Sequence, residues 1–182
     1  MLTNWGYSVE ELTDILTVAE CRAITGTEAP DAMVEAGIQA AQAAIRNNCG
    51  WHVAPPLQCV YETESAGFRE IQLPATFVKD VTATVDGQAV DVEAKHTGRI
   101  RRADGKPFPD SWGSVEVSYT AGVDASQVKQ LVAKLAASAV ASPAGIRSES
   151  IGSASVTYAS TEIELTSNVQ AVLGAYRVKA RP

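Results

Sequence analysis

The period of the hydrophobic pattern changes twice along this 182-residue chain. From Gln58 to Tyr119 apolar residues recur at every second position, which is the spacing of strands that bury one face. On both sides of this stretch they recur at spacings of three and four residues, which indicates amphipathic helices. A chain with this pattern cannot be all-helical or all-strand.

Four segments are predicted to be helical. The signals are a capping box at Ser8 and Glu11, a proline in a first turn at Pro30, an N-cap at Asp124, and a hydroxyl N-cap at Thr166 or Ser167. The third of these helices extends from Asp124 to Ala141 and is expected to form part of the core. We therefore predict an α+β fold, mainly a helical bundle with inserted antiparallel β-hairpins and a C-terminal helix or tail. The whole chain, 1–182, is expected to form one domain.

The strand region contains two turn signals. Asp86-Gly87 separates two alternating runs and predicts a two-residue hairpin, because a type I′ turn needs positive φ at both central positions. Residues 94–113 are polar and rich in glycine and proline, so we expect an exposed loop there.

The charge is unevenly distributed. Residues 1–64 carry a net charge of −7 and residues 65–182 a net charge of +1, for a total of −6. A negative total argues against broad binding of nucleic acid or of an anionic membrane. After Glu164 the remaining charges are all positive, so the C-terminus is a small cationic segment. We find no segment with the length and hydrophobicity of a membrane span and no secretory signal at the N-terminus, and we expect no membrane partner.

Motifs for catalysis are weak. Cys49 and His52 lie close in sequence, but nucleophilic catalysis needs a third orienting group, and a structural role is the simpler explanation. The three cysteines form no CxxC pair, and the two histidines, His52 and His96, lack metal-ligand spacing. Carboxylate pairs such as Glu10 and Glu11 fit a solvated surface. We expect no enzyme activity, no cofactor and no bound metal.

The order of several motifs resembles the head-tail connector family of tailed bacteriophages, which are head-completion or adaptor proteins. An alanine-rich helix is followed by Leu73-Pro74 and a valine-rich hairpin at Asp86-Gly87. Further along come WGSVEVSYTAG (112–122), a long helix, GIRSESIG (145–152), and Tyr176-Arg177 near the end. The resemblance covers roughly residues 30–178.

The resemblance implies a structural virion protein located at the neck, the junction of head and tail, after assembly in the host cytoplasm. Such a protein forms a ring of about a dozen copies beneath the portal protein and extends the DNA channel. It presents a docking surface for the stopper or tail-completion protein, and packaged DNA passes through with weak nonspecific contact at most. Its C-terminal segment, here within 166–182, anchors to the portal.

Two sets of residues are candidate interaction sites. The C-terminal set, which would dock on the portal, consists of Val169, Val172, Leu173, Tyr176, Arg177, Lys179 and Arg181. The loop set, which would contact a neck protein or DNA, consists of Arg99, Arg101, Arg102 and Lys106. The alternatives are a solvated terminal helix, whose last-turn cations the helix dipole favours, and an ordinary soluble loop tip. The tryptophans Trp5, Trp51 and Trp112 are expected in the core or at interfaces.

Three other functions remain open from the sequence. A stopper or tail-completion protein would occupy the distal side of the same neck. A small cytosolic enzyme or ligand-binding domain would have a pocket converging on His52 or His96. A general protein-binding module would carry a peptide groove on its hairpins.

Overall fold

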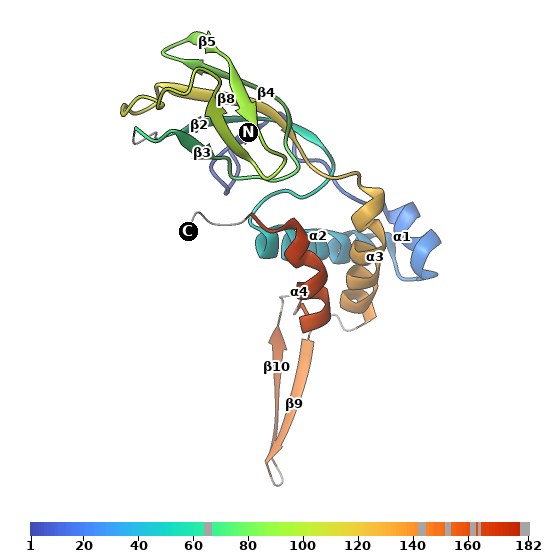
Figure 1. Ribbon diagram of the computed structural model, residues 1–182. Helices are drawn as coiled ribbons and strands as arrows, with labels where there is room; N and C mark the ends of the chain where they lie inside the picture. Colours follow the sequence, from blue (N-terminus) through green and yellow to red (C-terminus); the bar gives the residue numbers. More distant parts are fainter. Residues whose placement is uncertain (64–66, 142–144, 152–153, 161–162, 164, 179–182) are drawn as a thin grey trace. The chain divides into compact units, whose positions relative to one another are not determined.

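The computed structural model describes residues 1–63, 67–141, 145–151, 154–160, 163 and 165–178 (Figure 1). Its contacts group the chain into two compact units. Unit 1 comprises Met1–Thr13, Cys49–Asp124 and Gly174–Pro182, and unit 2 comprises Asp14–Asn48 and Ala125–Leu173. The chain passes between the units four times, so neither unit is one continuous stretch of sequence.

The larger sheet of unit 1 has five antiparallel strands in the order β1-β2-β8-β4-β5. The strands are β1 (Ser8–Val9), β2 (Leu57–Thr63), β4 (Lys79–Val85), β5 (Gln88–Val90) and β8 (Val115–Ala121). The hairpin predicted at Asp86-Gly87 is confirmed, since Val85 pairs with Gln88 and the two turn residues have φ of 50° and 75°.

A second sheet of unit 1 has three antiparallel strands in the order β3-β7-β6. These are β3 (Glu70–Gln72), β6 (Val92–Ala94) and β7 (Arg99–Arg102). Strand β7 lies inside the segment 94–113 that the sequence predicts as a loop. Its sequence, RIRR, has only one apolar residue, Ile100. One apolar residue does not make an alternating pattern, so the sequence does not identify a strand here.

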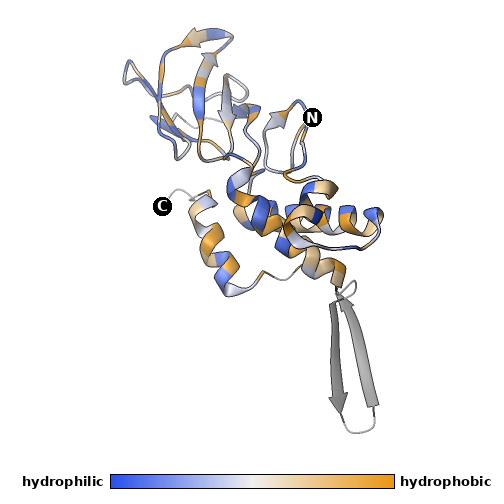
Figure 2. Cartoon of the chain, turned by 90° about the vertical axis from the view of Figure 1, so that its right-hand side faces the viewer, coloured by the Kyte–Doolittle hydropathy of each residue, from blue (hydrophilic) through white to orange (hydrophobic). Residues whose placement is uncertain are grey.

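The core of unit 1 lies on the inward faces of these strands. Along β8, Val115, Val117, Tyr119 and Ala121 are buried and the residues between them are more exposed. Figure 2 shows hydrophobic and hydrophilic segments alternating along the strands of this unit. Trp51 and Phe108 add large, fully enclosed side chains, and burial of such a side chain stabilises the fold by about 1.5–3 kcal/mol.

Helix α1 (Val18–Thr25) of unit 2 begins later than the sequence predicts. The capping box is formed by Thr17 and Glu20, and the backbone of Ser8 pairs in β1 instead. The prediction of a helix starting at Ser8 is therefore wrong. Both segments carry a hydroxyl three residues before a glutamate, and the sheet partner β2 decides which of them caps a helix.

Helices α2 (Asp31–Cys49) and α3 (Ser126–Ala141) of unit 2 match their predicted segments closely. On α2, Val34, Ile38, Ala41 and Ile45 are buried at helical spacing. The two helices approach closely at Gly37, where an added Cβ would lie 2.9 Å from the carbonyl oxygen of Ala136.

The rest of unit 2 is a hairpin and a short helix. Strands β9 (Gly145–Ile151) and β10 (Ala154–Ser160) pair antiparallel over seven residues each. Helix α4 (Ser167–Leu173) begins where predicted, and the Thr166 hydroxyl accepts a hydrogen bond from the Val169 amide. The 3₁₀ turn η1 (Gly174–Tyr176) follows it in unit 1.

The α+β prediction is confirmed, but the description as mainly a helical bundle is not. Among the described residues there are ten strands and four α-helices, and eight of the strands form two sheets, while β9 and β10 form a separate hairpin. The reason is the pairing of β2 and β4 on both sides of β8, which joins distant segments into one sheet. No helix among the described residues has the length and apolar character needed to cross a bilayer.

Candidate interaction surfaces

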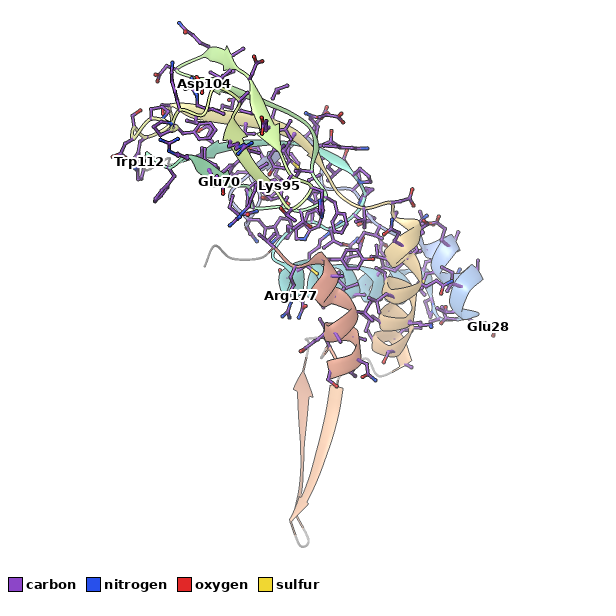
Figure 3. The ribbon with its side chains drawn as sticks, in the orientation of Figure 1. Glu28, Glu70, Lys95, Asp104, Trp112 and Arg177 are labelled. Carbon is purple, nitrogen blue, oxygen red and sulfur yellow. The ribbon has the colours of Figure 1, made fainter. Side chains whose placement is uncertain are left out.

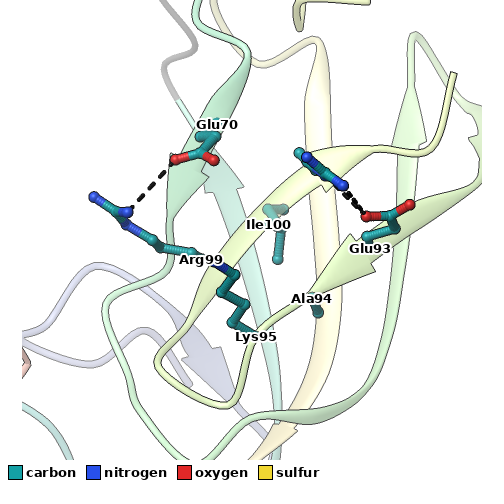
Figure 4. A pocket seen from close by; sticks show the side chains of 7 residues that line it. Glu70, Glu93, Ala94, Lys95, Arg99 and Ile100 are labelled. Carbon is teal, nitrogen blue, oxygen red and sulfur yellow. Dashed lines mark hydrogen bonds and ion pairs between the residues drawn. The ribbon is translucent and has the colours of Figure 1, made fainter. Parts of the chain in front are cut away.

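The exposed face of the β3-β7-β6 sheet brings two of the four predicted loop residues, Arg99 and Arg101, together. Ile100 is buried beneath the sheet, so its neighbours Arg99 and Arg101 point to the other face. Strand register places Arg101 opposite both Glu70 and Glu93. Figure 4 shows these side chains around a hollow of about 180 Å³.

Each of these arginines has a carboxylate partner on a neighbouring strand. Arg101 forms an ion pair of 2.6 Å with Glu93, and its Nε donates to the same oxygen at 2.8 Å. Arg99 lies 3.8 Å from Glu70. These pairs are exposed and therefore contribute little stability, but they lower the charge that the face presents to a partner.

The other two loop residues, Arg102 and Lys106, gather around Asp104. The Arg102 guanidinium donates to both Asp104 carboxylate oxygens, at 3.0 and 2.7 Å, and the Lys106 amide donates to one of them. The hydrogen bonds from Arg102, followed by that from the Lys106 amide, lower the pKa of Asp104 to about 2. The turn after β7 is therefore held by a carboxylate that stays charged, and its cations are partly neutralised.

The loop set and its neighbours form one surface that carries three more cations than carboxylates. Its six cations are Arg69, Lys95, Arg99, Arg101, Arg102 and Lys106, and its three carboxylates are Glu70, Glu93 and Asp104. The carboxylates neutralise half of this positive charge, so the surface is less cationic than the arginine-rich sequence of β7 suggests.

Trp112 is the most exposed large hydrophobic side chain in the described part of the chain, at 82%. It lies on the loop between β7 and β8, and Figure 3 shows it pointing away from the strands. The loop is fastened below it by Phe108, whose side chain is buried and whose amide donates to the Phe68 carbonyl at 2.9 Å. Of the two roles expected for the tryptophans, the structure gives Trp51 a place in the core and leaves Trp112 on the surface.

The residues of the predicted C-terminal set differ in their exposure to solvent. Val172 is 60% exposed and Arg177 is exposed, whereas Val169 and Tyr176 are half-buried and Leu173 is buried. Lys179 and Arg181 lie outside the described residues.

Residues 174–178 belong to unit 1 and are attached to it at three points. The Trp51 indole donates a hydrogen bond to the Tyr176 carbonyl, and the Val178 amide donates to the Cys49 carbonyl at 3.4 Å. The Tyr176 ring also lies 5.8 Å from that of Phe77. This segment is therefore part of a packed unit up to Val178.

A hollow of about 360 Å³ lies in unit 2 between α2 and the segment that precedes α4. Its apolar lining comes from small residues of the helix and from two larger side chains of the segment: Ala40, Ala43, Ala44, Ile163 and Leu165. Asn47 and Gln170 add amide groups. The sequence signal was the run of alanines on α2, which permits close approach of another surface.

The residues near His52 form a buried structural network. The Tyr7 hydroxyl lies 2.7 Å from His52 Nδ1 and accepts from the His52 amide at 3.1 Å, while Nε2 lies 2.8 Å from the Ala121 carbonyl. A carbonyl only accepts, so Nε2 carries the proton and Nδ1 accepts from Tyr7. Burial, offset in part by the charge of Arg177, raises the pKa of the Cys49 thiol to about 11. A thiol with this pKa is poorly suited to nucleophilic attack at neutral pH.

His52 and His96 do not line the hollows described above. Among the described residues, no group of three His, Cys, Asp or Glu side chains is arranged to hold a metal ion. The surfaces that stand out are ion-paired, aromatic or apolar patches on well-packed units, which is the character of a binding or assembly protein.

Comparison with known proteins agrees with this class. The head completion protein family model matches residues 14–179, so the chain belongs to that family of bacteriophage virion proteins. The predicted resemblance is thereby confirmed at the family level, and head completion is a structural role rather than a catalysed reaction. No curated protein matches the chain.

The fold is also similar to that of a chain from the neck of an empty GTA particle, computed with C6 symmetry. The two chains are 21% identical, the alignment covers 97% of each, and the TM-score is 0.64. At this identity the likeness concerns the fold.

Proposed function

We propose that this chain forms a ring at the neck of a phage or phage-like particle, where it joins the portal protein to the stopper or tail-completion protein around the DNA channel. Membership of the head completion protein family over residues 14–179 carries the proposal. The similar fold in a neck that was computed with C6 symmetry supports a ring whose copy number is a multiple of six, such as twelve.

The cationic excess of the β3-β7-β6 face suits an acidic surface on a neighbouring neck protein. Opposite charges at an interface increase the rate of association and select the partner, even where each ion pair adds little affinity. DNA passing through the channel would meet arginines that are already paired, so its contact with this face is weak and nonspecific.

The portal-docking role belongs to the exposed part of the C-terminal set. Val172 and Arg177 are accessible, and Lys179 and Arg181 follow the attached segment that ends at Val178. Leu173 and Tyr176 support this end of the chain from within, because one is buried and the other packs on Phe77.

The test is the set of proteins that co-purify with a tagged copy from host cells infected by the source phage. The full chain is expected to recover portal and neck proteins. A version ending at Val178, which keeps every described contact and loses two cations, is expected to lose the portal selectively. The matched control carries Lys79→Ala and Lys134→Ala, which remove two exposed cations elsewhere, and should behave as the full chain.

Recovery of no virion component by the full chain would refute the neck role. Recovery of the portal by the version ending at Val178, at the level of the full chain, would refute a docking role for Lys179 and Arg181 and leave the neck role standing.

A further inference from the structure

We propose that Trp112 of one copy docks into the α2 hollow of the next copy, where the α2 hollow is the one lined by Ala40, Ala43, Ala44, Ile163 and Leu165. The inference rests on the proposed ring and names the contact that would hold neighbouring copies together.

Trp112 has the properties of an interface anchor. It is 82% exposed, and Phe68, whose carbonyl is bonded to the same loop, is 47% exposed. Tryptophan is among the residues most enriched where a few side chains carry most of the binding energy, because its large ring loses much water-exposed area on docking.

The loop presents Trp112 in a fixed position. Ser111 and Ser114 on its two sides are joined by two hydrogen bonds, from the Ser114 hydroxyl and amide to the Ser111 carbonyl, at 2.8 and 3.4 Å. Phe108, buried four residues earlier, fastens the other end of the loop. An anchor that is already ordered loses little conformational entropy on binding.

The α2 hollow fits a neutral aromatic side chain. Its volume of about 360 Å³ is at the small end of the range for ligand pockets, which suits a single side chain. The alanines make room against the helix, Ile163 and Leu165 supply an apolar wall, and the Asn47 amide supplies an acceptor for an indole N–H. The described lining residues of the hollow are apolar or carry uncharged amides.

A second copy is the occupant because every copy carries both halves of the contact on different units. Trp112 lies in unit 1 and the hollow in unit 2, so the two patches are not the same surface. A contact between two different patches is heterologous, and repeating it closes a ring when the rotation from copy to copy divides a full turn, as the proposed ring requires. One kind of contact therefore suffices for all copies.

Mixing two variants that each carry one added cysteine tests this contact. Ser111→Cys marks the loop next to Trp112, and Asn47→Cys marks the hollow; both positions are exposed. Mild oxidation can join the two variants only between copies. The native thiols Cys21, Cys49 and Cys59 are buried, so their background reaction is small. The control replaces Asn47→Cys by Ala32→Cys, which is also exposed on α2 and lies about 20 Å away along the helix.

The expected result is a disulfide-linked heterodimer from the Ser111→Cys and Asn47→Cys pair, in concentrated protein and in necks purified from infected cells. Adding Trp112→Ala should weaken the association by about 30-fold or more, as for other hot-spot residues, and Trp112→Phe should restore part of it. The Ala32→Cys pair should give little product.

Equal products from Asn47→Cys and Ala32→Cys, no effect of Trp112→Ala, or cross-linking of Asn47→Cys to a different neck protein would each overturn the contact. Rings of this chain that give no heterodimer would also overturn it while sustaining the proposed function. Necks that contain no ring of this chain would instead refute the proposed function.

Discussion

For the replacement of Gly37 by alanine, helix propensity and the packing of α2 against α3 predict opposite changes in stability. Helix propensity alone favours alanine over glycine in a helix interior by about 1 kcal/mol. The structure opposes this gain, since the new Cβ would lie 2.9 Å from the Ala136 carbonyl oxygen and 3.0 Å from Val140 Cγ2. The valine methyl can turn away, but the carbonyl belongs to the backbone of α3 and moves only with the helix.

Overpacking of this kind typically costs about 1–3 kcal/mol. After the propensity gain is subtracted, we expect Gly37→Ala to lower the free energy of unfolding by up to about 2 kcal/mol. The measurement is urea unfolding followed by far-UV circular dichroism, in which the midpoint should fall while the slope is unchanged.

The matched control is Ala36→Gly, the reverse exchange at the exposed neighbouring position of α2. It should cost about 1 kcal/mol through propensity alone. A Gly37→Ala protein that is stabilised by about the same amount would show that α2 and α3 are not in close contact at this point.

Three further outcomes are expected. The hydrogen bond from Lys129, followed by that from the Thr17 amide, lowers the pKa of Glu20 to about 2, so the stability from this ion pair is present above pH 4.5 and is lost as pH falls towards 2. Glu20→Gln should therefore reduce the free energy of unfolding at neutral pH by less than about 1 kcal/mol, because the pair is partly exposed. In urea titrations at decreasing pH, the difference from the parent protein should vanish near pH 2. A difference that stays constant with pH would contradict this. Because burial raises the pKa of the Cys49 thiol to about 11 and that of Cys59 to about 12, a thiol reagent at mildly alkaline pH should label these two cysteines only after unfolding. Fast labelling of both in the folded protein would count against their buried positions. Tyr7→Phe removes both hydrogen bonds to His52 and should lower the thermal midpoint of unfolding, whereas an unchanged midpoint would show that the network adds no stability.

The elements that the sequence predicts correctly have local signals. Helix α2 has its apolar stripe, a proline at its start and a glycine at its end, and the Asp86-Gly87 hairpin needs only two residues with positive φ. Helix α3 is marked by an uninterrupted apolar stripe. In each case the decisive interaction lies within a few residues of the signal.

The errors occur where a distant partner decides the structure. Ser8 carries a good capping box but pairs with Val60 of β2, a segment whose position cannot be read from residues 8–11. Strand β7 is not predicted from the sequence because three of its four residues are arginines. It forms a strand because β3 and β6 pair with it on both sides. The ion pairing that partly neutralises the loop set has the same origin.

The candidate sites follow the same rule. The sequence could identify the cationic residues and the tryptophans, since charge and ring size are properties of the residue. It could not tell Trp51 from Trp112. Trp51 is buried beside His52, Phe77 and Tyr176, whereas Trp112 lies exposed on a loop. The α2 hollow requires two segments more than a hundred residues apart and has no local signal beyond the alanines.

The ring at the neck is tested most directly by an electron cryo-microscopy reconstruction of necks purified with a tagged copy of this chain. We expect a ring of this chain, in a multiple of six copies, coaxial with the DNA channel and between the portal and the next neck protein. A chain that is absent from the neck, or present there without forming a ring around the channel, would contradict it.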